Sequence, residues 1–189
     1  MITPIRLSGK FVDLEPIELS HREELRAISQ DDSIWHYATS GKDFDRWFEK
    51  ALESDTQCAF IVRRKDDGKL VGSTRYYDIE LKHRRLMIGY TWYISEARGS
   101  MINPETKLLL LSYAFESQNI NRITFMIDSR NLRSIAAVKK LGAKQEGILR
   151  EHMILEDGYI RDSIVLSILQ SEWAEIKQVL GERLDKITS

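Results

Sequence analysis

The sequence predicts an α/β (α+β) protein with a mixed, mostly antiparallel sheet of seven strands and helices on both faces. Three observations support this fold class. Short β-branched and aromatic stretches are separated by segments with helical periodicity. Two turns contain Asp-Gly, which is typical of hairpins between antiparallel strands. A leucine-rich helix separates the fourth and fifth strands, which favours a parallel crossover. At 189 residues the chain suits a single domain over 1–189, with its core at about 7–170.

The N-terminal part is predicted to form one strand and two helices. Residues 11–18 read as the strand. Ser20, with Glu23 three positions later, fits a capping box that begins the first helix. A second helix from Asp43 has an aromatic stripe at helical spacing. The stripe consists of Phe44, Trp47, Phe48 and Ala51.

The middle of the chain is predicted to form three antiparallel strands and a buried helix. The strands are expected at 59–64, 70–79 and 86–94. Asp67-Gly68 joins the first two as a hairpin. The helix at 104–117 is apolar on most sides, with Asn103 as its cap and Pro104 in its first position.

The C-terminal part is predicted to form three strands and two helices. The strands are expected at 122–127, 144–155 and 159–169, and the helices after Asn131 and at 171–186. Gly142 ends the first of these helices. Asp157-Gly158 joins the last two strands.

The composition narrows the class of partner. Lys plus Arg total 28 against 29 Asp plus Glu, so net charge favours neither nucleic acid nor acidic lipid. The single cysteine, Cys58, cannot form an internal disulfide and is expected to be a small buried residue of a strand. No apolar run suits a membrane span, and the N-terminus lacks the apolar core of a secretory signal. We therefore expect a cytoplasmic protein that binds neither nucleic acid nor membrane.

Two polar residues stand where a strand meets a short helix. Asn131 and Ser134 follow the strand at 122–127, and ligands of open α/β sheets tend to lie outside the carboxyl ends of strands. The alternative is purely structural. Asn131 is then an N-cap and Ser134 a first-turn residue, and for Asn131 both roles can hold together.

The loop before the leucine-rich helix is a candidate anion site. Arg98 adds charge, Gly99 allows a close backbone approach, and a helix N-terminus offers unpaired N–H groups. An ordinary surface turn with a solvated arginine explains the same residues equally well. The residues alone leave both interpretations open.

An ordered set of motifs resembles the GCN5-related N-acetyltransferase (GNAT) superfamily. The motifs are GSTRYYDI at 72–79, IGYTWYI at 88–94, ARGSMINPETK at 97–107, NLRSIAAVKKLGAKQEG at 131–147, LREHMILEDGYIRDSIVLSIL at 149–169 and EW at 172–173. Within that superfamily the chain is most similar to the ribosomal-protein-alanine N-acetyltransferase (RimJ/RimL-type) branch. The resemblance covers about residues 7–184.

The resemblance implies a GNAT-like fold with acetyl-coenzyme A as cosubstrate and no metal. Trp92, Tyr93 and Ile94 would line the pantetheine arm through their backbone. The pyrophosphate loop would be formed by Arg98, Gly99, Ser100, Met101, Ile102 and Asn103. Met101 and Asn103 occupy positions where the superfamily usually has glycine or alanine. Asn131 would bind the pantetheine, and Ser134 would lie near the sulfur.

The implied reaction is transfer of acetyl to a primary amine by direct attack in a ternary complex. The amine is a protein N-terminus or a small molecule. Ser134 is the candidate acid for the thiolate, directly or through water, and Glu80 the candidate base, with a water chain as its alternative. An acceptor pocket could be shaped by Trp35, Tyr37, Trp47 and Phe48, although such a stripe also suits a core.

Two further expectations concern class and assembly. A non-catalytic acyl-coenzyme A binding, regulatory protein is the rival interpretation, motivated by the departures at Met87, Met101 and Asn103. A homodimer is a candidate assembly. The histidines have no zinc-like spacing with Cys or carboxylates, so no metal site is predicted.

Overall fold

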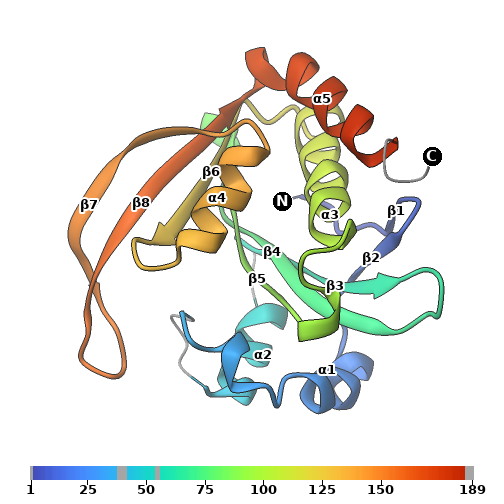
Figure 1. Cartoon of the computed structure of the whole chain (residues 1–189), viewed down its shortest axis with the longest axis vertical. Coiled ribbons are helices and arrows are strands. Elements are labelled where there is room, and N and C mark those ends of the chain that lie inside the picture. Colours follow the sequence, from blue (N-terminus) through green and yellow to red (C-terminus); the bar gives the residue numbers. More distant parts are fainter. Residues whose placement is uncertain (1, 38–41, 54–55, 186–189) are drawn as a thin grey trace.

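The computed structural model describes residues 2–37, 42–53 and 56–185. Its strands form one mixed sheet in the order β1-β2-β3-β4-β5-β6-β8-β7 (Figure 1). The strands are β1 Leu7–Ser8, β2 Val12–Pro16, β3 Cys58–Arg64, β4 Leu70–Glu80, β5 Arg85–Tyr93, β6 Arg122–Asp128, β7 Lys144–Ile154 and β8 Ile160–Leu169. Within the described residues the sheet has eight strands rather than the predicted seven. The additional strand, β1, pairs with β2. Because β1 has only two residues, it is too short to leave a periodic pattern.

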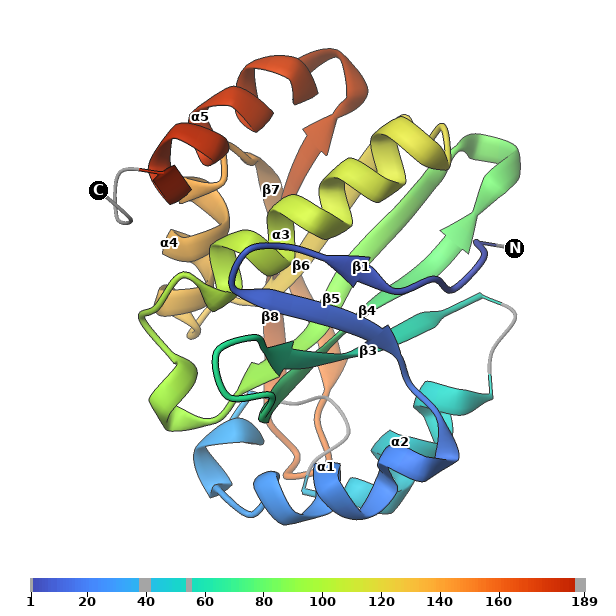
Figure 2. The same cartoon turned by 90° about the vertical axis from the view of Figure 1, so that its right-hand side faces the viewer.

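Helices cover both faces, as predicted (Figures 1 and 2). On one face lie α1 Arg22–Ile28 and α2 Phe44–Leu52, and on the other lie α3 Ile102–Ser112, α4 Leu132–Lys140 and α5 Trp173–Asp185. A π-helical turn, Tyr113–Ser117, extends α3. Each face has its own apolar core: the aromatic stripe of α2 packs on the first face, and the leucines of α3 on the second.

Two predicted helix starts were wrong. Ser20 is not an N-cap, because a 3-10 turn at Leu19–His21 precedes α1, and His21 Nδ1 accepts the Glu18 backbone N–H at 3.0 Å. Helix α3 begins at Ile102, so Asn103 lies inside the helix and Pro104 is its third residue. Ser100 Oγ instead accepts the Ile102 N–H at 3.3 Å. The N-cap at Asn131 is confirmed.

The crossover between β5 and β6 is parallel, as predicted, but it is short. Its register runs only from Arg85↔Arg122 to Met87↔Thr124. Both strands continue beyond these pairs, β5 to Tyr93 and β6 to Asp128, and they diverge as they do so (Figure 1). We call the resulting gap between the two strands the wedge. All other neighbouring strands are antiparallel.

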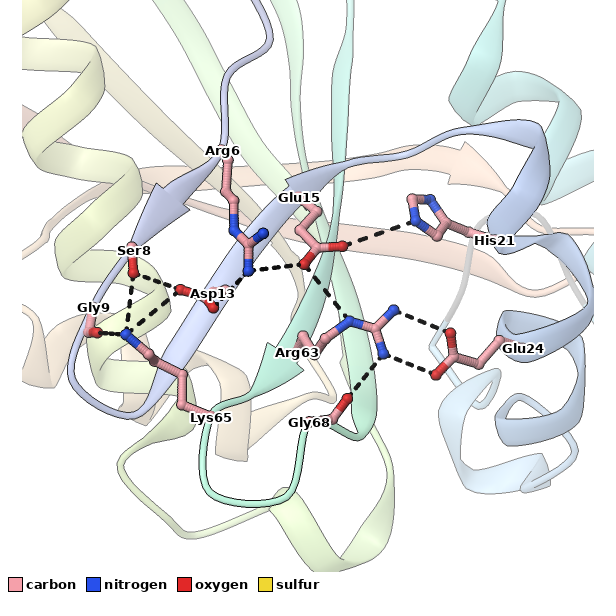
Figure 3. A network of polar contacts seen from close by, with 10 residues as sticks. All are labelled: Arg6, Ser8, Gly9, Asp13, Glu15, His21, Glu24, Arg63, Lys65 and Gly68. Atoms are coloured by element: carbon pink, nitrogen blue, oxygen red, sulfur yellow. Dashed lines mark hydrogen bonds and ion pairs between the residues drawn. The ribbon is translucent and has the colours of Figure 1, made fainter.

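A polar network fastens the edge of the sheet formed by β1, β2 and β3 to α1 (Figure 3). At its centre, the Arg63 guanidinium lies 3.0 Å from Glu24 Oε1 and 3.6 Å from Glu15 Oε1, and it donates to the Gly68 carbonyl at 2.9 Å. Each exposed pair adds little alone, but a shared network orders all its members.

Candidate active site

The wedge exposes the backbone edges of two strands. On β5, the Ile94 N–H donates to the Val71 carbonyl at 2.9 Å, toward β4. Hydrogen-bonded residues alternate along an antiparallel ladder, so the polar backbone groups of Tyr93 point to the other edge, toward β6. On β6, the Ser129 N–H donates to Asp162 of β8, which directs the backbone of Met126 toward β5 by the same rule. The wedge therefore offers donors and acceptors with no strand between them.

A β-bulge shapes the β5 side of the wedge. Between Ser73↔Trp92 and Arg75↔Gly89 the register gains one residue on β5, and Tyr90 has a φ of 49°. Such a conformation is uncommon outside glycine, and β-bulges are over-represented next to active sites. Buried Arg75 braces the bulge, its Cζ lying 4.4 Å from the Tyr90 ring centroid.

A cleft of about 830 Å³ passes through the wedge and reaches both faces of the sheet. Eight of the predicted site residues line it: Trp92, Tyr93, Arg98, Gly99, Ser100, Asn103, Asn131 and Ser134. Four others do not: Glu80, Ile94, Met101 and Ile102. The cleft thus collects residues from β5, from the start of α3 and from the start of α4.

Glu80, the candidate base, is held away from the cleft. Its carboxylate pairs with Arg85 and lies 3.1 Å from His83 Nε2. Asp78, two residues earlier, does line the cleft, and its nearest cation is Arg85 Nη1 at 3.4 Å. At this turn Asp78, rather than Glu80, is therefore in position to meet a bound molecule.

The loop entering α3 is organised by Arg98. Its Nε donates to the Tyr93 carbonyl at 2.9 Å and its Nη1 to Ser33 Oγ at 2.7 Å. The guanidinium therefore positions the end of β5, and the loop itself offers backbone to an anion. Gly99 has a φ of 77°, which favours glycine at this position.

At the start of α4, the Asn131 side chain is the N-cap. Its Oδ1 accepts the Ser134 N–H at 3.0 Å, so the cap role is present in this structure. This first turn of α4 holds both residues in place, and both line the cleft. The two roles considered for Asn131 are thus geometrically compatible.

Lys107 is a cleft residue that sequence reasoning missed. It is 4% exposed, and its Nζ donates to Thr91 Oγ1 at 2.7 Å and to Thr74 Oγ1 at 3.2 Å. Burial lowers the pKa of Lys107 to about 7. In the sequence it is a single lysine in a helix that is otherwise apolar on most sides, and only the packing of α3 on the sheet shows that it is buried.

Three further cations line the cleft beside α3: Arg133, Lys140 and Arg183. They come from α4 and α5, and none forms an ion pair with another described residue. Because they lack such partners, they are available to phosphate groups of a ligand. Their spacing in the sequence gives no hint that they converge.

The opposite face of the cleft is aromatic. Trp35, Tyr37 and Trp47 line it, as anticipated, and the Trp47 and Trp92 rings pack at 5.6 Å. Phe48 does not line it and belongs to the core under α2. Over the part of the chain that the structure describes, no three metal-ligating side chains cluster, and no helix is long and apolar enough to span a bilayer.

This fold and site define a class of protein. A sheet opened by a wedge, with a helix N-terminus and unpaired cations on one face and an aromatic chamber on the other, suits an extended phosphate-bearing ligand that meets a second molecule inside the sheet.

Residues 12–144 match the family described as acetyltransferase (GNAT) domain. A protein of Bacillus subtilis (strain 168) named "Putative ribosomal N-acetyltransferase YdaF" is 30% identical over 107 residues, which span 57% of each chain. Spermidine N(1)-acetyltransferase of Escherichia coli (strain K12) is 26% identical over 191 residues, covering 96% of this chain and 98% of that one. A GCN5-related N-acetyltransferase from Brucella melitensis has a TM-score of 0.90 at 26% identity, covering 96% of this chain and 86% of that one.

The chain belongs to the GNAT acetyltransferase family. The family resemblance expected from the sequence and the GNAT-like fold are thereby confirmed. Enzymes of this family are N-acetyltransferases that use acetyl-coenzyme A as cosubstrate, and the α3/α4 side of the cleft is lined by cations.

Proposed function

We propose that this protein transfers an acetyl group from acetyl-coenzyme A to a primary amine by direct attack in a ternary complex. The observation that carries the proposal is the cleft through the wedge. It connects a cationic, helix-lined face with an aromatic face, so two molecules can approach one point from opposite sides. An acyl thioester is already activated, and this arrangement needs no nucleophile from the protein.

The residues divide into binding and chemistry. The loop from Arg98 to Asn103 and the start of α3 would bind the pyrophosphate, with Arg133, Lys140 and Arg183 available to the remaining phosphate. The backbone edge of Tyr93 and the amide of Asn131 would flank the pantetheine. A backbone N–H at the bulge would stabilise the developing oxyanion.

Ser134 is the proposed proton donor to the departing thiolate, directly or through water. The base is proposed to be Asp78 or a water chain, because Glu80 lies outside the cleft. A protein N-terminus and a small amine both remain candidate acceptors. A cytoplasmic location and a homodimer remain predictions.

The rival, a non-catalytic acyl-coenzyme A binding protein, was motivated by Met87, Met101 and Asn103. Met101 does not line the cleft, and the Asn103 Oδ1 accepts the Tyr93 hydroxyl at 3.3 Å. A side chain at position 103 therefore has a structural partner that holds it against β5.

The test is release of free coenzyme A with a panel of peptides, amino acids, polyamines and aminoglycosides. Cys58, the single cysteine, is buried, so a thiol reagent reports coenzyme A with little background. Turnover with any amine supports the proposal. Binding of acetyl-coenzyme A without turnover on any acceptor would support the rival.

A variant tests the assigned acid. Ser134→Ala should lower kcat by roughly 100-fold and leave the Kd for acetyl-coenzyme A nearly unchanged. Ser95→Ala, at an exposed position outside the cleft, is the matched control. An unchanged kcat in Ser134→Ala would remove Ser134 from the chemistry.

A further inference from the structure

A buried arginine without a matching carboxylate faces the cleft from β8. The Arg161 side chain is 6% exposed. Its Nη2 donates to the Met126 carbonyl at 3.3 Å, and its buried Nε has no hydrogen-bond partner. The nearest carboxylate oxygen, Asp128 Oδ2, lies 3.9 Å from Nε, beyond hydrogen-bond range. A guanidinium has five donors, and the buried Nε–H of Arg161 is one that is not used.

Asp128 is already committed to another cation. Its carboxylate accepts the Arg130 backbone N–H at 2.9 Å, Nε at 3.0 Å and Nη2 at 2.8 Å. Asp78, the other carboxylate lining the cleft, lies next to Arg85. Two guanidinium groups thus share one carboxylate, which leaves about one uncompensated positive charge in a buried place. An unpaired buried charge is costly, and a bound anion would relieve that cost.

The position of this charge relative to the wedge follows from strand parity. Met126 directs its carbonyl toward β5, and β5 has no partner there because pairing ends at Met87↔Thr124. By reaching that carbonyl, the Arg161 guanidinium lies at the wedge itself. Ile164 and Leu166, whose side chains point to the opposite face of β8 from Arg161, pack in the core under α3. The Arg161 side chain therefore lies on the other face of the sheet, near Tyr77 and Tyr90 and away from α3 and α4.

Burial lowers the pKa of Arg161, whereas Asp128, Tyr77 and Tyr90 oppose this change. The guanidinium nevertheless keeps its charge at neutral pH, because the ordinary arginine pKa is far above it. His152 also lines this part of the cleft, and its Nδ1 is 3.0 Å from Ser163 Oγ. Within the described residues, Asp128 is the only carboxylate at ion-pair distance from Arg161.

We propose that Arg161 binds a carboxylate of the acceptor, so that the preferred acceptor is an amine that carries a free carboxylate, such as an amino acid. This inference rests on the proposed acetyl transfer. The planar donor fork of arginine suits a carboxylate, and its position beside the wedge would hold the amine of the same molecule near the acyl group. The same positive charge would repel a polyamine, whose amines are all cationic.

The experiment compares kcat/KM for amino acids, their matched amides and spermidine. The wild-type protein should prefer each acid over its amide by roughly 10- to 100-fold, which is the range for a hydrogen bond to a charged group. Arg161→Gln should abolish this preference through KM for the acids, with kcat/KM for the amides nearly unchanged. Arg161→Lys should restore part of it.

Two control measurements show whether the variants fold: the KM for acetyl-coenzyme A and thermal unfolding, each compared with the wild type. If Arg161→Gln does not fold, Arg161→Lys decides, and an acid-to-amide preference equal to that of the wild type overturns the proposal. Turnover of amides or spermidine as efficient as that of acids overturns the carboxylate proposal and leaves acetyl transfer intact. No turnover with any acceptor overturns both.

Discussion

Lys107 gives the protein a distinctive pH dependence of stability. Burial lowers its pKa from 10.5 to about 7, a difference that corresponds to about 5 kcal/mol. Between these values the unfolded chain holds a proton that the folded chain has lost, so stability rises with pH across this window. Below pH 7 both states are protonated and the full cost of burying the charge is present.

The replacement Lys107→Met removes this titration and keeps a long side chain under β5. The Thr74 and Thr91 hydroxyls, 2.8 Å apart, still pair with each other. We therefore expect Lys107→Met to be more stable than the wild type at pH 7, and this advantage to shrink by about 2 kcal/mol between pH 7 and pH 9.

The assay is urea unfolding followed by tryptophan fluorescence at pH 7, 8 and 9. Other groups titrate in the same window, so the difference between the two proteins is the informative quantity. Parallel curves, with a constant difference across the three pH values, would refute the reasoning that Lys107 is buried as a nearly neutral amine.

Further predictions follow from close contacts around the site. In Gly72→Ala the new Cβ would lie 2.2 Å from the Trp92 carbonyl, so we expect the free energy of unfolding to fall by about 1–3 kcal/mol and acetyl-coenzyme A to bind more weakly by calorimetry. Gly147→Ala, where a Cβ would meet open space, is the control and should change neither quantity. Glu105→Ala removes the acceptor for three backbone N–H groups at 2.6–2.8 Å and should lower the free energy of urea unfolding by about 2–4 kcal/mol; a loss below that of Glu105→Gln would contradict this role. Asn131→Ala should cost about 1 kcal/mol of stability and Asn131→Asp almost none, and equal losses would contradict the cap. Burial raises the pKa of Cys58 to about 12, so a thiol reagent should react at pH 8 only after denaturation, and rapid reaction of the native protein would disagree.

Most of the fold was predictable because its signals are local. Asp67-Gly68 marked a hairpin, the apolar run of α3 marked a crossover, and Asn131 marked a helix start. The errors also had local causes. Ser20 matched the capping-box pattern, but it lies inside a 3-10 turn, one residue before the N-cap of α1 at His21. Strand β1 is too short for any periodicity.

The site was less predictable because it is formed by residues that come together from distant parts of the chain. The residues around α3 and α4 carry motifs, and their position in the cleft could be expected from resemblance. Lys107 and Arg161 lie within the quoted motifs at 97–107 and 149–169, but those motifs assigned them no role. Their importance comes from burial without a carboxylate partner at hydrogen-bond distance, which is a property of packing across elements far apart in the chain.

The central claim is that the wedge between β5 and β6 binds acetyl-coenzyme A. The most direct measurement is a crystal structure of the protein with coenzyme A. We predict the pantetheine arm between the Tyr93 edge and Asn131, with the pyrophosphate at the start of α3. Coenzyme A bound elsewhere, with the wedge free of it, would contradict the account.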